Sequence, residues 1–240
     1  GADLTAEQDA VKKTVKPRSV PGNTLALIEP QAEWNYLAGS DPSGDWTSLD
    51  FDDSKWKTGQ AGFGYGDDDD MTVLDMKNKY SRVYIRREFT MPAEIGREEI
   101  KRLGGQLQLL LNYDDAFIAY LNGKEFARVG IDSGSGANAK KITSHEANDF
   151  GMWVPEDGSS LIRPGRNIIA IEGHNADKDS SDFTLDPLLV VSDYGDLKKL
   201  LEAADKKKAA ELEAAKKTLQ QIPLLRDVLE EQFTVEQIDL

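Results

Sequence analysis

The 240-residue chain contains no cysteine and only two histidines, His145 and His174. The absence of cysteine excludes disulfides, thiolate nucleophiles, Cys-ligated zinc and covalently attached haem. Two histidines leave little for a histidine-rich metal site. The chain is therefore not expected to be a thiol enzyme or a metalloprotein with Cys or His ligands.

Basic residues are also scarce. There are 29 Lys and Arg against 43 Asp and Glu, a formal net charge of -14. Affinity for nucleic acids comes mainly from Lys and Arg that neutralise phosphates, so this charge argues against a nucleic-acid partner. It argues equally against an anionic membrane surface. No run of about 18 apolar residues occurs, so we expect no membrane insertion.

The chain falls into three stretches of different composition. Residues 1–21 are polar, and a capping-box pattern within them predicts a short helix. Residues 22–194 hold nearly all the glycine, every tryptophan and most of the β-branched and aromatic residues. From Gly195 the composition changes to Leu, Ala, Glu and Lys, so residues 195–240 are predicted to form a helical extension.

The middle stretch is predicted to form strands. Apolar and polar residues mostly alternate over residues 83–91 and again over 107–111. Asn122-Gly123 separates two apolar runs, which is the strongest short signal of a β-hairpin. Further strands are expected at residues 24–28, 167–172 and 184–191. Several short strands with long polar loops and little helix indicate a mainly β protein with an antiparallel β-sandwich.

The C-terminal stretch has apolar residues near the 3.6-residue period from Leu197 to Ile222. Pro223 is expected to end or kink this helix, and a second amphipathic helix is expected to follow. Another capping-box pattern stands at residues 234–237, which we interpret as a helix start that leads to a further domain. The helices of residues 195–240 either pack back on the sandwich or bind a protein partner.

A series of spaced motifs lies within residues 30–192. The motifs are Phe51-Asp52-Asp53-Ser54-Lys55-Trp56, Gly62-Phe63-Gly64-Tyr65-Gly66-Asp67, Tyr84-Ile85-Arg86-Arg87-Glu88-Phe89, Asn112 to Gly123, Pro164 to Glu172, and Ser180-Ser181-Asp182. The series resembles the galactose-binding-like jelly-roll domains of bacterial extracellular proteins, and the sugar-binding domain of family 2 glycosidases shares a looser outline. The resemblance implies a jelly-roll sandwich and an extracellular or periplasmic location, with any signal peptide removed or outside this sequence.

Four consecutive aspartates at residues 67–70 are the first candidate for chemistry. Calcium binds six to eight oxygen atoms, which carboxylates supply. The resemblance adds that many galactose-binding-like domains hold a structural calcium in a loop. The run lacks EF-hand spacing, because Thr72 stands where that motif has glycine. Two interpretations stay open, a solvated acidic loop and a structural Ca2+ held by Asp67, Asp68 and Asp70.

Five residues are predicted to contact a ligand. Sugar rings present an apolar C–H face to flat aromatic rings, and Trp46, Tyr65 and Trp153 lie in or near loops. Asp114 and Asp115 stand between two apolar strands, where they either bond local amides in a turn or line a polar pocket at the rim of the sandwich. For the aromatic residues the alternative is a place in the core or as loop anchors.

No catalytic signature is present. Residues 134–136 do not form a nucleophile elbow. Asp149 stands where a zinc-protease motif that begins at His145 requires its second histidine. We therefore predict no catalytic residue and no required cofactor, a structural Ca2+ aside.

Three functions are weighed on this basis. The first is a non-catalytic carbohydrate-binding accessory module of a secreted bacterial protein, with a neutral glycan as its ligand because like charges repel polyanions. The second is a structural or protein-interaction module that uses the helical extension. The third is a glycoside hydrolase that uses a pair of carboxylates.

Overall fold

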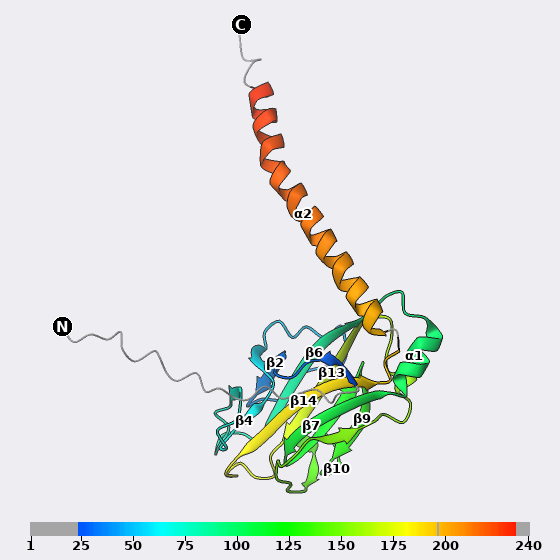
Figure 1. Ribbon diagram of the computed structural model, residues 1–240. Helices are drawn as coiled ribbons and strands as arrows, with labels where there is room; N and C mark the ends of the chain where they lie inside the picture. Colours follow the sequence, from blue (N-terminus) through cyan, green and yellow to red (C-terminus); the bar gives the residue numbers. More distant parts are fainter. Residues whose placement is uncertain (1–23, 196, 234–240) are drawn as a thin grey trace, which may run out of the picture. The chain divides into compact units, whose positions relative to one another are not determined.

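The computed structural model describes residues 24–195 and 197–233, so the predicted helix within residues 1–21 and the pattern at 234–237 lie outside the described residues. The chain divides into two compact units, Gly1–Tyr194 and Gly195–Leu240. The division falls at the residue where the composition changes. Figure 1 shows the strands of the first unit and the long helix of the second.

The first unit contains two six-stranded sheets. Sheet A consists of β12 (Gly151–Trp153), β7 (Leu107–Asp114), β14 (Phe183–Ser192), β4 (Phe63–Tyr65) and β5 (Thr72–Val73), with β1 (Thr24–Ile28) paired to the far end of β14. Sheet B consists of β3 (Lys57–Gln60), β2 (Glu33–Ala38), β6 (Arg82–Met91), β13 (Gly165–His174), β8 (Ala116–Leu121) and β9 (Lys124–Val129). A separate hairpin is formed by β10 (Ile131–Ser133) and β11 (Lys140–Ile142).

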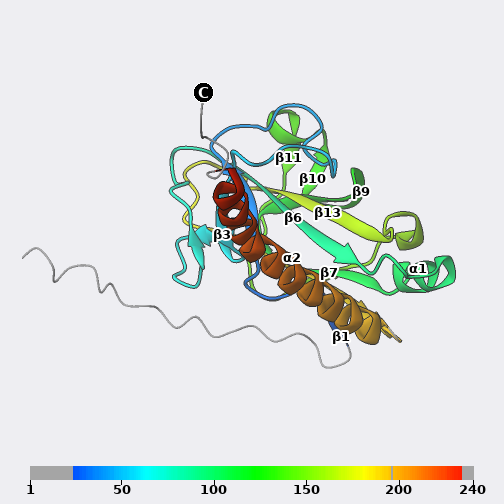
Figure 2. The ribbon, with the colours of Figure 1, turned by 90° about the horizontal axis from the view of Figure 1, so that it is seen from above.

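The chain passes repeatedly from one sheet to the other. Strands β6, β7 and β8 belong to sheets B, A and B, and β12, β13 and β14 belong to sheets A, B and A. Among the described strands, every pair is antiparallel except β4–β5. Figure 2 shows β6 and β13 side by side in sheet B, where their residues pair over the whole length of both strands.

The core lies between the two sheets. The rings of Tyr36 on β2 and Phe63 on β4 approach to 5.3 Å between centroids. Gly173 on β13 packs so closely on sheet A that an added Cβ would lie 2.8 Å from Cζ of Phe183. Burial of both inner faces stabilises the sandwich through the hydrophobic effect. The predicted mainly β, antiparallel sandwich is therefore confirmed.

Most of the predicted strands are also confirmed. The strand expected at residues 24–28 is β1, and those at 83–91, 167–172 and 184–191 lie within β6, β13 and β14. Asn122 and Gly123 join β8 to β9 with φ values of 50° and 84°. Positive φ at both central residues is what a type I′ hairpin turn requires.

Parts of the outer faces of both sheets are buried as well. On sheet B, Tyr84 and Arg86 of β6 and Glu172 of β13 are each 1% exposed. On sheet A, Asp114 is 4% exposed and Thr184 is 3% exposed. Simple alternation would place these polar side chains in water. Loops cover them instead, and the candidate sites lie where these loops meet the sheets.

Two features of the helices differ from the predictions. The helix α1 (Arg97–Gly104) was not expected from the sequence. The helix α2 (Leu197–Phe233) continues through Pro223, so the prediction of two separate helices is wrong. Proline removes one backbone hydrogen bond, and the strong helix formers on both sides maintain the remaining turns. In the described part of the chain, no helix combines the length and the apolar character that membrane spanning requires.

Candidate functional site

Residues 39–56, between β2 and β3, cover part of the outer face of sheet B. Arg86 anchors this segment, because its Nη1 donates to Asp53 Oδ2 at 2.7 Å and its Nη2 donates to the Ser48 carbonyl at 2.8 Å. Its guanidinium carbon lies 4.9 Å from the centroid of the Phe51 ring. Burial lowers the pKa of Arg86 and the Asp53 carboxylate opposes this effect. The paired charge holds the loop against the sheet.

Trp46 extends from this segment into a cluster of aromatic rings. It stacks on Trp56 with 6.2 Å between centroids and meets the edges of Tyr84 at 5.1 Å and Tyr120 at 5.7 Å. The indole is half-buried. Packing on three rings fixes its orientation and leaves part of the ring at the surface.

The exposed part of Trp46 lines a surface hollow of about 190 Å³, which we call the aromatic hollow. Its other lining residues are Asp41, Pro42, Tyr84, Ser135, Gly136, Ala137, Asn138 and Glu172. They come from the segment after β2, from β6 and β13, and from the turn between β10 and β11. The hollow thus combines aromatic rings, two carboxylates and backbone amides.

Asp41 is held at the edge of the aromatic hollow by two donors. The Tyr84 hydroxyl donates to Asp41 Oδ1 at 2.5 Å, and Arg82 Nε donates to the same oxygen at 2.9 Å. Burial would raise the pKa of Asp41, but these hydrogen bonds outweigh it and lower the pKa. Burial and the bond to Asp41 together raise the pKa of Tyr84. Asp41 is therefore ionised and Tyr84 neutral at physiological pH.

Glu172 is the second carboxylate of the aromatic hollow. Its Oε1 accepts a hydrogen bond from the Gly136 amide at 3.1 Å and lies 3.0 Å from Nε2 of His174. His174 is the last residue of β13 and is itself buried. The hydrogen bond from Gly136 joins β13 to the turn between β10 and β11, so two of the segments that line the hollow are held together.

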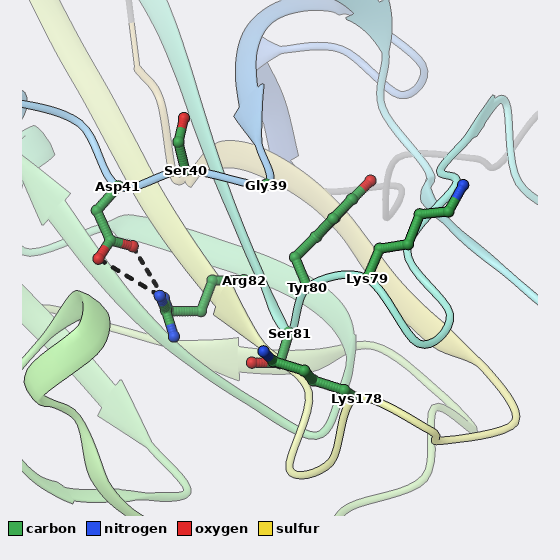
Figure 3. A pocket seen from close by; sticks show the side chains of 8 residues that line it. All are labelled: Gly39, Ser40, Asp41, Lys79, Tyr80, Ser81, Arg82 and Lys178. Atoms are coloured by element: carbon green, nitrogen blue, oxygen red, sulfur yellow. Dashed lines mark hydrogen bonds and ion pairs between the residues drawn. The ribbon is translucent and has the colours of Figure 1, made fainter.

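A second hollow, of about 130 Å³, shares Asp41 with the first. Figure 3 shows its lining residues and the ion pair between Arg82 and Asp41. Lys79 and Lys178 add two further basic side chains, although Lys79 pairs with Asp75. Polar groups of both signs therefore extend beyond the aromatic hollow along the surface.

The acidic run at residues 67–70 lies beside the outer face of sheet A. The structure brings Asp67, Asp69 and Asp70 together, with one carboxylate oxygen of each within 4.8 Å of the others. Asp68 is outside this group and has a φ of 66°. Burial, followed by the charges of Asp67 and Asp69, raises the pKa of Asp70 to about 8. The calcium site predicted at Asp67, Asp68 and Asp70 stays a prediction.

Asp114, the last residue of β7, lies on the same outer face and pairs in register with Thr184 of β14. Its Oδ1 is buried and has no hydrogen-bond partner in the described residues. Burial, followed by the charges of Asp115 and Asp182, raises the pKa of Asp114 to about 7. A carboxylate in this position is destabilised unless a positive charge or a proton joins it.

Asp115 and Tyr65 are engaged in holding loops. Asp115 Oδ1 accepts from the His145 amide at 2.8 Å, and its Oδ2 accepts from the Ala176 amide at 2.7 Å. The Tyr65 hydroxyl donates to the Ser180 carbonyl at 2.9 Å. Both side chains are buried. They join the ends of β4, β7 and β13 to neighbouring loops at one rim of the sandwich.

Trp153, on β12, is not near the aromatic hollow. Its ring meets the edges of Tyr113 at 5.6 Å and Phe117 at 4.8 Å between centroids. The side chain is half-buried. Of the five predicted ligand residues, Trp46 lines the aromatic hollow and Trp153 packs against Tyr113 and Phe117. The other three, Tyr65, Asp114 and Asp115, lie at one rim of the sandwich.

Sequence reasoning did not identify Asp41, Tyr84 and Glu172 as site residues. Tyr84 and Glu172 occupy polar positions of alternating strands, which normally face water. Asp41 lies in a loop and meets Tyr84 across 43 positions of the sequence. Only the sheet register, which places Glu172 opposite Tyr84, brings these groups together.

No protein-family model and no curated protein matches the chain. Among solved structures it is similar to the Bacteroides uniformis β-glucuronidase, with 15% identity over 70% of this chain and 17% of that chain and a TM-score of 0.42. The Bifidobacterium dentium β-glucuronidase complexed with coumarin-3-O-glucuronide is 18% identical over 66% of this chain and 21% of that chain, with a TM-score of 0.39. A β-glycosidase from Bacteroides vulgatus is 13% identical over 71% of this chain and 20% of that chain, also with a TM-score of 0.39. The chain thus spans about a fifth of the length of these three proteins.

Proposed function

We propose that this chain is a non-catalytic carbohydrate-binding accessory module of a secreted bacterial protein, and that its glycan occupies the aromatic hollow. One observation carries the proposal. Trp46, Tyr84, Asp41 and Glu172 line the same surface hollow, although they come from a loop and two strands far apart in the sequence.

The chemistry of the hollow suits a sugar ring. The C–H face of a pyranose packs on aromatic surface, and its hydroxyls donate to carboxylates and accept from amides. Trp46 and Pro42 supply apolar surface, while the exposed Asp41 and Asn138 supply polar atoms and the buried Glu172 lies beneath them. Because packing already holds Trp46, binding a sugar costs little side-chain entropy.

The state of the two carboxylates supports binding rather than hydrolysis. A glycosidase needs one carboxyl whose pKa is raised so that it can protonate the leaving group. The hydrogen bonds from Tyr84 and Arg82 lower the pKa of Asp41 and keep it ionised. Glu172 is engaged by the Gly136 amide and lies against His174. Asp41 is thus a hydrogen-bond acceptor for sugar hydroxyls and not a general acid.

The test is a glycan screen followed by titration of the best neutral glycan into three proteins: wild type, Ala137→Trp and Ala93→Trp. Ala137 lines the hollow and is exposed, so the larger side chain fills the hollow without removing a core contact. Ala93 is exposed in the turn after β6 and is the matched control.

We expect Ala137→Trp to weaken binding by roughly tenfold or more and Ala93→Trp to leave it unchanged. Equal binding by wild type and Ala137→Trp would move the glycan site away from the hollow. No binding by wild type across a broad panel would reject the carbohydrate function, and the protein-interaction hypothesis for α2 would then be tested first.

A further inference from the structure

Three segments converge at one rim of the sandwich, apart from the aromatic hollow. Asp114 ends β7, Glu146 lies between β11 and β12, and Asp182 immediately precedes β14. One carboxylate oxygen of each residue lies within 4.8 Å of the other two. We call these three residues the acidic cluster. Repulsion between the three negative charges opposes this arrangement unless a positive charge or a proton offsets it.

The burial of Asp114 provides evidence that is independent of the clustering. Its side chain is 4% exposed, and Oδ1 has no hydrogen-bond partner in the described residues. A buried charged oxygen without a partner costs several kcal/mol. Among the side chains that the structure describes, those of residues 24–195 and 197–218, no Lys or Arg forms an ion pair with Asp114, Glu146 or Asp182. The described side chains therefore supply no ion-pair partner to balance these charges.

The other unpartnered atoms near the acidic cluster are also oxygen acceptors. Asn112 lies two residues before Asp114 on the same strand face, and its buried Oδ1 has no partner. Asn175 donates through Nδ2 to the Asp182 carbonyl at 2.8 Å, while its Oδ1 is buried and unpartnered. An excess of oxygen acceptors without donors is the surrounding that a hard cation prefers.

We propose that Asp114, Glu146 and Asp182 bind one divalent cation, with Ca2+ preferred over Mg2+. Carboxylate oxygens favour these hard cations over zinc or copper. Oxygens opposite each other around Ca2+ are about 5 Å apart, twice the Ca–O distance, which accommodates the observed spacing. Mg2+ requires a tighter and nearly ideal octahedron, which three ligands from three separate segments do not readily form.

This site differs from the calcium site predicted at Asp67, Asp68 and Asp70. Asp67 lies close to the acidic cluster, because its Oδ2 is 3.4 Å from Oγ1 of Thr184, and Thr184 pairs in register with Asp114. Among the six carboxylates of the two groups, Asp114 alone combines near-complete burial with an unpartnered oxygen, which favours the acidic cluster as the cation site. The cation would join β7 to two loops, and this role does not depend on glycan binding.

The experiment titrates CaCl2 and MgCl2 separately into the metal-free full chain by calorimetry, with thermal melts in Ca2+ and in chelator. Two variants form a matched pair, Glu146→Gln and Asp149→Asn. Each removes one negative charge from an exposed position between β11 and β12, but only Glu146 belongs to the acidic cluster. Asp182→Asn tests a second ligand, and Asp69→Asn tests the neighbouring loop.

We expect one Ca2+ per wild-type chain, weaker binding of Mg2+, and a higher melting temperature in Ca2+ than in chelator. Glu146→Gln and Asp182→Asn should each weaken Ca2+ binding by about tenfold or more, whereas Asp149→Asn should bind as wild type. Loss of binding in Asp69→Asn with normal binding in Glu146→Gln would place the ion in the loop and overturn the proposal. So would the absence of binding and of any melting shift up to about 10 mM Ca2+, above the range of weak extracellular sites.

Discussion

The outer faces of the two sheets hold carboxylates in contrasting ways. On sheet B, Asp41 accepts hydrogen bonds from Tyr84 and Arg82, and Glu172 accepts one from the Gly136 amide. On sheet A, Asp114 and Asp70 each keep a buried oxygen without a partner, and burial raises their pKa values to about 7 and about 8. Donors within the protein stabilise the carboxylates on the first face, whereas a proton or a bound cation is needed to offset the buried charges on the second face.

Arg86→Met should have the largest effect, because it removes the internal compensation on sheet B. Asp53 would lose its partner at 2.7 Å, and the Ser48 carbonyl would lose its donor. Breaking a buried ion pair typically costs 3–5 kcal/mol, and since Asp53 is partly exposed we expect about 3 kcal/mol. Urea denaturation measures the loss. Arg97→Met, at an exposed position on α1, is the control and should change stability little. A loss below about 1 kcal/mol in Arg86→Met would contradict this account.

Gly64→Ala should disturb the face of sheet A next to the acidic loop. The added Cβ would lie 2.1 Å from the Phe183 carbonyl oxygen and 2.3 Å from Asp70 Oδ1. We expect a loss of about 2 kcal/mol in the free energy of unfolding, because backbone atoms must move. In Gly96→Ala the Cβ meets nothing within 4 Å at a φ of -74°, so this matched substitution should be nearly neutral. Equal stability of the two variants would contradict the close packing of Gly64 against the Phe183 carbonyl and Asp70.

Tyr84→Phe should have a smaller effect, and the effect should depend on pH. The variant loses the hydrogen bond to Asp41, which should cost about 1.5 kcal/mol at neutral pH because the acceptor is charged. That bond lowers the pKa of Asp41. The bond therefore contributes fully to stability above the ordinary pKa of an aspartate, and this contribution is lost as the pH falls through the lowered pKa of Asp41. The stability difference between wild type and variant should therefore shrink below about pH 4. A difference that stays constant down to pH 2 would exclude Asp41 as the responsible acceptor.

Asp114→Asn should have the smallest effect on stability. Unlike the substitutions on sheet B, it should stabilise the metal-free protein. In chelator the variant removes an uncompensated buried charge and should be about 1 kcal/mol more stable than wild type. In Ca2+ it should lose the calcium-dependent rise in melting temperature. Melts of both proteins under both conditions measure these changes. If Asp114→Asn is less stable than wild type in chelator, an internal donor already compensates Asp114.

The sequence predicted well wherever a local rule decided the structure. Alternation over residues 83–91 predicted β6, and Asn122-Gly123 predicted the turn between β8 and β9. Local rules failed for the helices. Propensity of the residues around Pro223 overrode the break expected from proline, and α1 has too few residues to establish a clear apolar period.

The candidate sites could be predicted only in part, because they depend on what covers the outer faces. Trp46 was identified from its place in a loop and does line the aromatic hollow, whereas its partners Tyr84 and Glu172 were not identified. Asp114 was identified as a ligand candidate and Asp182 only as part of a motif, and nothing in either segment indicates that the two side chains meet. Sequence patterns describe one strand or helix at a time, and contacts between distant segments leave no periodic signal.

By itself the sequence determined the mainly β class, most strand positions, the hairpin turn and the absence of thiol chemistry, since all of these follow from local backbone preferences and composition. Only the tertiary structure decided which polar residues are buried. Strand register places Glu172 beside Tyr84, and the end of β7 carries Asp114 to Glu146 and Asp182. Burial then determines the chemistry, because a carboxylate removed from water is stabilised by a donor within the protein, by a bound cation or by taking up a proton.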